Sequence, residues 1–161
     1  MRLATLAVLT ALALGGCGEG TNGGGPSFNI TDANDRQVTR LVAAELGART
    51  EEGDRRRVRD AVCTPRECTI SYEADAPVLD TRDTLLEEQR PIWRQLFSDP
   101  DLRNAVLVTY GQTVSVGGKE SISAALRVRC NRAAHGQIDW RKINAEGIRQ
   151  LCGVRELVSF D

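Results

Sequence analysis

Five cysteines and one histidine are the residues best able to do chemistry in this sequence of 161 residues. Paired thiols can exchange with a substrate disulfide, and sets of cysteine and histidine can bind zinc. Four residues separate Cys63 from Cys68, whereas thiol–disulfide oxidoreductases use C-x2-C spacing. A zinc site would need paired C-x2-C spacings or nearby histidines, and His135 is the only histidine. The spacing therefore favours structural disulfides, with a zinc site as the rival interpretation.

The fifth cysteine, Cys17, ends a segment with the proportions of a secretory signal. Arg2 supplies a positive charge, and residues 3–14 are almost wholly apolar. A run of this length suits the h-region of a signal peptide and is too short for a membrane-spanning helix, which needs roughly 20 such residues. Residues 14–17 (Leu-Gly-Gly-Cys) resemble the lipobox of bacterial lipoproteins, in which an aliphatic residue stands three positions before an invariant cysteine. An ordinary cleaved signal with an incidental cysteine is the alternative.

The lipobox resemblance implies how the protein is processed and where it resides. It implies that a signal peptide, residues 1–16, is removed and that Cys17 then carries acyl chains. Since two or more chains anchor a protein stably, it also implies a membrane-anchored protein on the exported face of a bacterial cell envelope. The glycine-rich composition predicts a flexible linker over residues 17–27. Residues 28–161 are the length of a single domain.

The four cysteines outside the signal are an even number, which in an exported protein indicates a disulfide framework. Four cysteines allow three pairings. We favour Cys63–Cys68 and Cys130–Cys152, because each pair joins consecutive predicted elements.

Hydrophobic periodicity predicts the elements that position these cysteines. In chain order they are a helix from a cap at Thr31 or Asp32 to Leu46, strands at 58–62 and 69–73, a helical stripe over 85–97, strands at 105–116 and 121–130 around Gly117-Gly118, and a helix from a cap at Asp139 to Cys152. Pro91 should divide or kink the second helix. The first helix should stop at Gly47 and the last at Gly153, and residues 154–161 could add an extended tail.

This order predicts an α+β fold in which a helix-plus-hairpin unit occurs twice, followed by a last helix. We expect a four-stranded, mainly antiparallel sheet with helices on one face and two disulfides.

Three further predictions concern side chains that resemble parts of a functional site. An arginine-rich stretch at residues 55–59 could grip phosphate, but flanking acids favour a solvated, self-neutralised segment. Trp93 and Phe97, one helical turn apart, should fill a core. His135 should be an exposed residue in a loop over residues 131–136. The acids that flank the arginines are Glu51, Glu52, Asp54 and Asp60.

The sequence supports no enzyme class, metal or cofactor. His135 is the only imidazole, and no G-x-S-x-G motif places a serine in a nucleophile turn. The glycine clusters lack the lysine of a phosphate-binding loop. A formal net charge of −1 argues against a nucleic-acid partner.

Three functional hypotheses follow. The favoured one is a lipid-anchored, non-catalytic binding or accessory module that contacts another envelope protein. The alternatives are a small-molecule-binding lipoprotein with a pocket between sheet and helices, and an enzyme with an unrecognised site.

Overall fold

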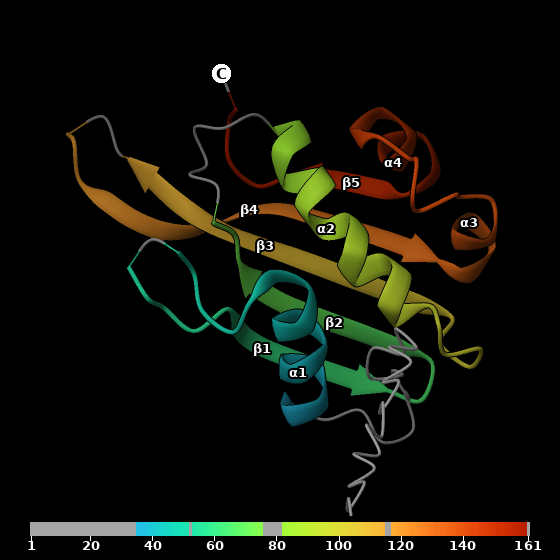
Figure 1. Cartoon of the computed structure of the whole chain (residues 1–161). Coiled ribbons are helices and arrows are strands. Elements are labelled where there is room, and N and C mark those ends of the chain that lie inside the picture. Colours follow the sequence, from blue (N-terminus) through green and yellow to red (C-terminus); the bar gives the residue numbers. More distant parts are fainter. Residues whose placement is uncertain (1–34, 52, 76–81, 115–116, 161) are drawn as a thin grey trace, which may run out of the picture.

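The computed structural model describes residues 35–51, 53–75, 82–114 and 117–160. Its elements, in chain order, are α1 (Asp35–Leu46), β1 (Val58–Thr64), β2 (Glu67–Glu73), α2 (Arg82–Leu96), β3 (Asn104–Val114), β4 (Glu120–Asn131), α3 (Arg132–Gly136), α4 (Ala145–Leu151) and β5 (Gly153–Glu156) (Figure 1). The predicted signal peptide, Cys17, the linker and the predicted cap at Thr31 or Asp32 lie outside the described residues.

The strands form one five-stranded mixed sheet in the order β1-β2-β3-β4-β5. β2 and β3 are parallel, whereas the other neighbouring strands are antiparallel. The prediction of a four-stranded, mainly antiparallel sheet built from helix–hairpin units is therefore wrong. Two short helices, α3 and α4, follow the second hairpin, and the chain then returns as β5 instead of ending in a tail.

The parallel pair results from the connection through α2. Residues of β2 and β3 pair from Glu67↔Asn104 to Glu73↔Tyr110, so the chain must return to the start of β2 before β3 begins. A helix of 15 residues is long enough to span a seven-residue strand, since helices rise about 1.5 Å and strands about 3.3 Å per residue. β2-α2-β3 is thus a crossover unit rather than a link between two separate hairpins.

Two details of the last helical region also differ from the prediction. Residues 132–136 form α3, which Asn131 caps by accepting a hydrogen bond from the Ala134 N–H. α4 begins at Ala145 because Asn144, and not Asp139, is the N-cap. The Asp139 carboxylate instead accepts a hydrogen bond from the Arg141 N–H in the preceding turn.

The first two helices follow their sequence patterns closely. α1 ends at Leu46, as predicted, and Gly47 follows with a positive φ of 87°, a conformation that glycine adopts easily. α2 runs continuously through Pro91, so of the two predicted alternatives, a division or a kink, the division into two helices is wrong.

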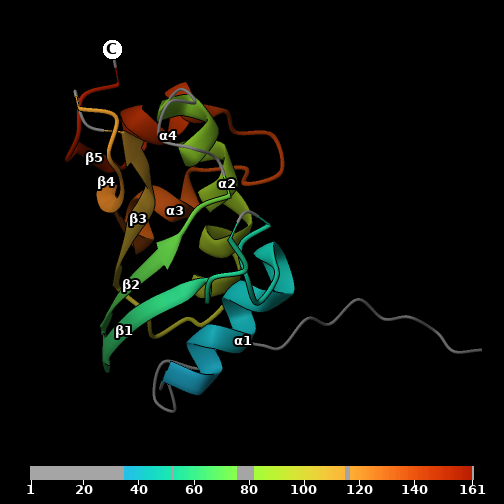
Figure 2. The same ribbon diagram turned by 90° about the vertical axis from the view of Figure 1, so that its left-hand side faces the viewer.

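Helices α1, α2 and α4 lie on the same face of the sheet (Figure 2). The core lies between these layers, where alternate residues of each strand meet the apolar stripes of the helices. On β2 and β3 the covered positions include Ile70, Tyr72 and Leu107, all fully buried. No described helix lies on the opposite face, which we call the open face (Figure 2).

Candidate functional site

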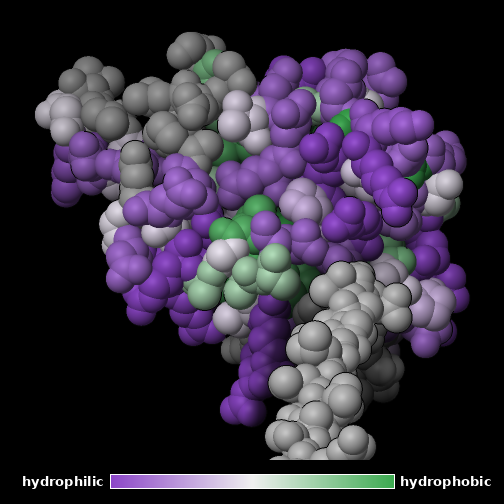
Figure 3. All heavy atoms as spheres, viewed as in Figure 1, coloured by the Kyte–Doolittle hydropathy of each residue, from purple (hydrophilic) through white to green (hydrophobic). Residues whose placement is uncertain are grey.

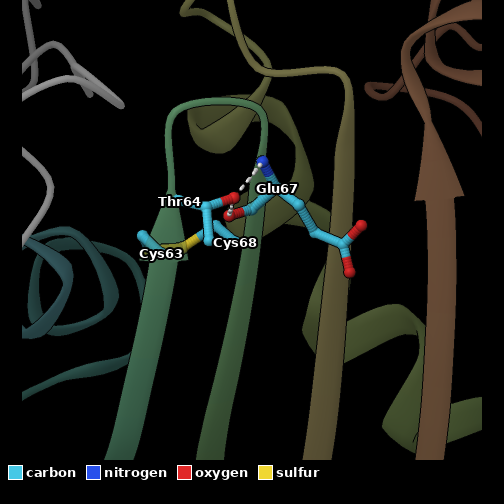
Figure 4. The surroundings of a disulfide bond; sticks show 4 residues. All are labelled: Cys63, Thr64, Glu67 and Cys68. Atoms are coloured by element: carbon cyan, nitrogen blue, oxygen red, sulfur yellow. Dashed lines mark hydrogen bonds between the residues drawn. A yellow bond between two sulfur atoms is a disulfide. The ribbon is translucent and has the colours of Figure 1, made fainter.

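The two predicted disulfides are present, and both have structural positions. Cys63 and Cys68 are register partners at the end of the β1–β2 hairpin. Thr64 Oγ1 accepts a hydrogen bond from the Glu67 N–H at 3.2 Å, which closes the turn beside the disulfide (Figure 4). Cys68 is fully buried. This arrangement fixes the register of the hairpin, as the sequence pattern predicts.

The second disulfide joins Cys130, near the end of β4, to Cys152, which caps the end of α4. This disulfide links the two ends of the segment that contains α3 and α4, and it thereby holds β5 at the edge of the sheet. In the described segments, no group of three or more His, Cys, Asp or Glu side chains is placed to hold a metal ion.

His135 lies in α3 and is half-buried, so the prediction of an exposed loop residue is wrong. Its ring centroid is 4.6 Å from that of Phe97 and 5.2 Å from that of Trp140, and Trp93 stacks on both of those aromatic rings. Burial, assisted by the Arg132 charge, lowers the pKa of His135 to about 4. The imidazole is therefore neutral at physiological pH and is one member of an aromatic cluster, together with the predicted core pair Trp93 and Phe97.

Arg57 is the most deeply buried charged residue of the arginine-rich stretch, with 1% of its surface exposed. Its guanidinium donates to the carbonyl of Leu46 at 2.7 Å, the carbonyl of Arg49 at 3.2 Å and the carbonyl of Glu73 at 3.1 Å. It also forms an ion pair with Asp75. The predicted solvated segment is thus wrong at this position, because Arg57 connects the end of α1 to the end of β2.

A second carboxylate, Glu88 of α2, lies 3.6 Å from the Arg57 guanidinium. Burial raises the pKa of Glu88 to about 7, and the charge of Asp75 adds to the increase while Arg57 opposes it. The pKa of the neighbouring Tyr72 is also raised well above its ordinary value, by burial and by the Glu88 charge. Of these ionisable groups, Arg57 and Tyr72 are buried, whereas Glu88 and Asp75 are half-buried.

A chain of hydrogen bonds extends this polar cluster through the core. Trp93 Nε1 donates to Gln89 Oε1 at 3.2 Å, and Gln89 Nε2 donates to Thr109 Oγ1 at 2.7 Å. Thr109 Oγ1 in turn donates to Tyr72 Oη at 3.3 Å. All four side chains are fully buried. The chain fixes the position of α2 over β2 and β3, because buried polar groups are costly without their partners.

The open face differs from the covered face in composition. Residues at the open positions alternate with core residues along each strand, so strand register places them in rows across the sheet. One row contains Asp60, Ser71, Val108, Arg127 and Arg155. The neighbouring row contains Val62, Thr69, Val106, Arg129 and Gly153.

Three ion pairs lie on the open face. Arg129 of β4 reaches over β3 to Glu67 of β2, with 3.3 Å between Nη2 and Oε2. The two side chains meet over β3, which explains why Val106 is fully buried although no helix covers it. On the β1–β2 side, Glu73 pairs with Arg55 at 2.5 Å and Arg59 at 2.7 Å.

Arg127 and Arg155 are exposed cations of the open face for which the described residues provide no such pairing. They are direct register partners on the antiparallel strands β4 and β5. Leu126 and Val128 face the core, so the side chain of Arg127 projects from the open face, and the same alternation about Val154 places Arg155 beside it. Neither guanidinium forms an ion pair with an acid in the described part of the chain. Like charges directly opposite each other destabilise a sheet, and no acid among the described residues compensates for this repulsion.

Strands β3 and β4 continue past their neighbours as a two-stranded arm (Figure 1). Pairing with β2 ends at Tyr110 and pairing with β5 ends at Leu126, whereas the β3–β4 ladder continues to Val114↔Glu120. Thr113 Oγ1 lies 3.0 Å from Ser121 Oγ and 3.2 Å from Ser123 Oγ, which aligns the two strands. The arm presents polar side chains and unpaired strand edges beyond the sheet.

No protein-family model matches this chain, and the searches of curated proteins and of solved structures found no match. Function must therefore be argued from the site itself. Within the described residues, no helix is both long enough and apolar enough to cross a membrane.

The open-face arginines were not identified as a site from the sequence. The sequence does contain a pattern that indicates this surface, because Arg127 and Arg129 alternate with apolar residues along one strand. Their pairing with Arg155 depends on β5, which was predicted as a tail.

Proposed function

We propose that this protein is a non-catalytic binding module of the bacterial envelope, anchored to the membrane through acylated Cys17 and acting through protein contacts on its open face. The observation that carries the proposal is that described helices cover one face of the sheet and leave the other face accessible. One side is covered by helices whose outer surface is mainly hydrophilic (Figure 3). The other side presents charged residues and the apolar Val62, which is 59% exposed.

The rigidity of the domain supports the proposal. One disulfide links the strands of the β1–β2 hairpin, and the other links the ends of the segment that contains α3 and α4. Arg57, which lies just before β1, bonds to the ends of α1 and β2. A rigid surface loses little conformational entropy on binding, which favours recognition.

The ionisable groups found in the structure favour a non-catalytic role. Arg57 and Tyr72 are buried, Glu88 is half-buried beside Arg57, and His135 lies against two aromatic rings. Each of these groups has a packing or hydrogen-bonding role that accounts for its position.

Photo-crosslinking in intact cells tests the proposal. A photoreactive amino acid is placed at Val62 or Thr69 on the open face, and at Ala44 on α1 or Arg94 on α2 as matched helix-side controls. We expect the open-face positions to crosslink to an envelope protein and the controls to give no such product. Equal products from both faces, or none from the open face, would contradict the proposal.

The anchor needs a separate test. Mass spectrometry of the native protein should show a chain that begins at an acylated Cys17. The C17S variant should be released from the membrane fraction. An unmodified cysteine, or a C17S variant that stays in the membrane fraction, would contradict the anchor.

A further inference from the structure

We propose that the β4–β5 half of the open face binds an acidic, extended segment of a partner protein, with Arg127 and Arg155 as the principal contacts. This inference rests on the proposed function and specifies the chemistry of the partner.

Two neighbouring cations of the open face have no acidic partner among the described residues. Arg127 and Arg155 are both exposed and stand directly opposite each other across β4 and β5. The Cβ atoms of such neighbours lie about 5 Å apart, so the two positive charges repel each other and destabilise the sheet. A carboxylate between them would remove this repulsion and accept charge-assisted hydrogen bonds from both side chains.

The cationic area is narrow, because an acidic residue lies at the other end of the same row. Asp60 occupies the same row as Arg127 but lies three strands away on β1. Adjacent strands are about 4.8 Å apart, which places these residues about 14 Å apart. A flat anionic bilayer in contact with the open face would meet Asp60 as well as the arginines. A single extended chain is narrow enough to follow β4 and β5 without reaching the acidic side.

The arginines of β4 have the spacing of alternate residues in an extended chain. Arg127 and Arg129 are two residues apart on one face, which corresponds to about 6.7 Å. Alternate residues of an extended partner have the same spacing. Arg129 already contacts Glu67, but its side chain is 58% exposed and such surface ion pairs are weak. A partner with acidic residues at every second position would therefore match Arg127 first and Arg129 next.

The direct test measures the binding of labelled peptides to the purified full chain by fluorescence anisotropy. The probes are an alternating Glu-Thr hexapeptide, a block peptide of three Glu and three Thr, and a Gln-Thr peptide without charge. We expect the alternating peptide to bind most tightly, the uncharged peptide not to bind, and binding to weaken as salt is added. Equal binding of the alternating and block peptides would overturn the extended-segment model.

The matched variants are R127E/R155E and R40E/R141E. Both change the net charge equally, but Arg40 lies on α1 and Arg141 lies in the turn before α4, and both are exposed. We expect R127E/R155E to weaken binding of the alternating peptide by about tenfold or more and R40E/R141E to have little effect. R127Q/R155Q should also weaken binding, which serves as a check if the double Glu variant folds poorly. Equal losses in R127E/R155E and R40E/R141E would overturn the proposal, because they would show a general charge effect.

Vesicle binding separates a protein partner from a membrane. The mature chain, residues 17–161, with the C17S change is mixed with vesicles of phosphatidylcholine alone or containing phosphatidylglycerol. Binding to the anionic vesicles that R127E/R155E abolishes would overturn the proposal in favour of a lipid-facing surface.

Crosslinking in cells separates failure of this inference from failure of the proposed function. If a crosslink from Val108, the open-face neighbour of Arg127 on β3, to an envelope protein persists in R127E/R155E, the open face binds a partner without these arginines and only the acidic-segment inference is overturned. If the crosslink is lost in R127E/R155E and kept in R40E/R141E, the inference is supported.

Discussion

Arg57 Nη1 lies 3.6 Å from Glu88 Oε1 in the interior of the protein, and the same guanidinium bonds to backbone carbonyls of α1 and β2. The ion pair therefore has two roles: it neutralises buried charge, and it joins elements that are distant in the sequence. Replacing one member of such a group leaves the other charges and carbonyls without partners.

We predict that R57M lowers the free energy of unfolding by about 3–5 kcal/mol, because it leaves a buried carboxylate and several carbonyls unsatisfied. Urea denaturation monitored by tryptophan fluorescence measures the change. R40M is the matched control, since Arg40 is exposed on α1 and should cost less than about 0.5 kcal/mol. Similar losses in the two variants would contradict the role given to Arg57.

The raised pKa of Glu88, about 7 against 4.5, predicts a pH dependence of stability. Between these two values the folded protein binds more protons than the unfolded chain, so this group makes stability fall as pH rises from about 4.5 to about 7. The full effect is up to about 3 kcal/mol. E88Q should remove this decline, whereas E87Q, an exposed neighbour on α2, should keep it. Unfolding curves at a series of pH values test the difference.

His135 predicts the opposite slope. Its pKa is lowered from 6.5 to about 4, so the unfolded chain binds more protons between these values and stability falls as pH decreases from about 6.5 to about 4. The effects of Glu88 and His135 oppose each other over about pH 4.5–6.5. We therefore expect E88Q to reveal a rise of stability with pH, and H135F to steepen the decline due to Glu88. Parallel pH profiles for these two variants would contradict both assignments.

The disulfides should contribute unequally to stability. In the chain-entropy model, a loop with a sequence separation of 5 contributes about 2 kcal/mol and one with a separation of 22 about 3 kcal/mol. We predict that C130S/C152S loses more stability than C63S/C68S in urea denaturation. C130S/C152S should also increase hydrogen exchange in β5, because the disulfide joins Cys130 of β4 to the residue that precedes β5. Unchanged exchange in β5 would argue against this role.

Local features of the fold could be predicted from the sequence because they depend on nearby residues. The stop of α1 at Gly47, the β3–β4 hairpin and the two disulfides each follow from short-range patterns. The cap of α4 was assigned wrongly because Asp139 and Asn144 are both good N-cap residues. The conformation of the turn before α4 in the folded protein determines which of the two residues caps the helix.

Sheet order and the open face depend on contacts between distant segments. Periodicity identifies β2 and β3 as strands but does not specify that they pair in parallel. β5 has only four residues, of which Val154 alone packs against the core, so its pattern is too short to identify a strand. Arg57 could not be distinguished from its neighbours Arg55 and Arg56, because its burial depends on carbonyls contributed by α1 and β2.

The opposed arginines lead to the last prediction, in which stability and binding change in opposite directions. R155E places a carboxylate directly across from Arg127 and converts a repulsive cross-strand pair into an attractive one. Such pairs contribute about 0.2–1 kcal/mol, so R155E should raise the thermal midpoint slightly. It should also weaken binding of the alternating Glu-Thr peptide, because the new carboxylate occupies Arg127 and repels the ligand. R155Q is the control: it removes the repulsion without adding an attraction, and its thermal midpoint should lie between those of the natural protein and R155E. If R155E is less stable than the natural protein, Arg127 and Arg155 are not in the repulsive contact described above, and the case for a missing acidic partner is weakened with it.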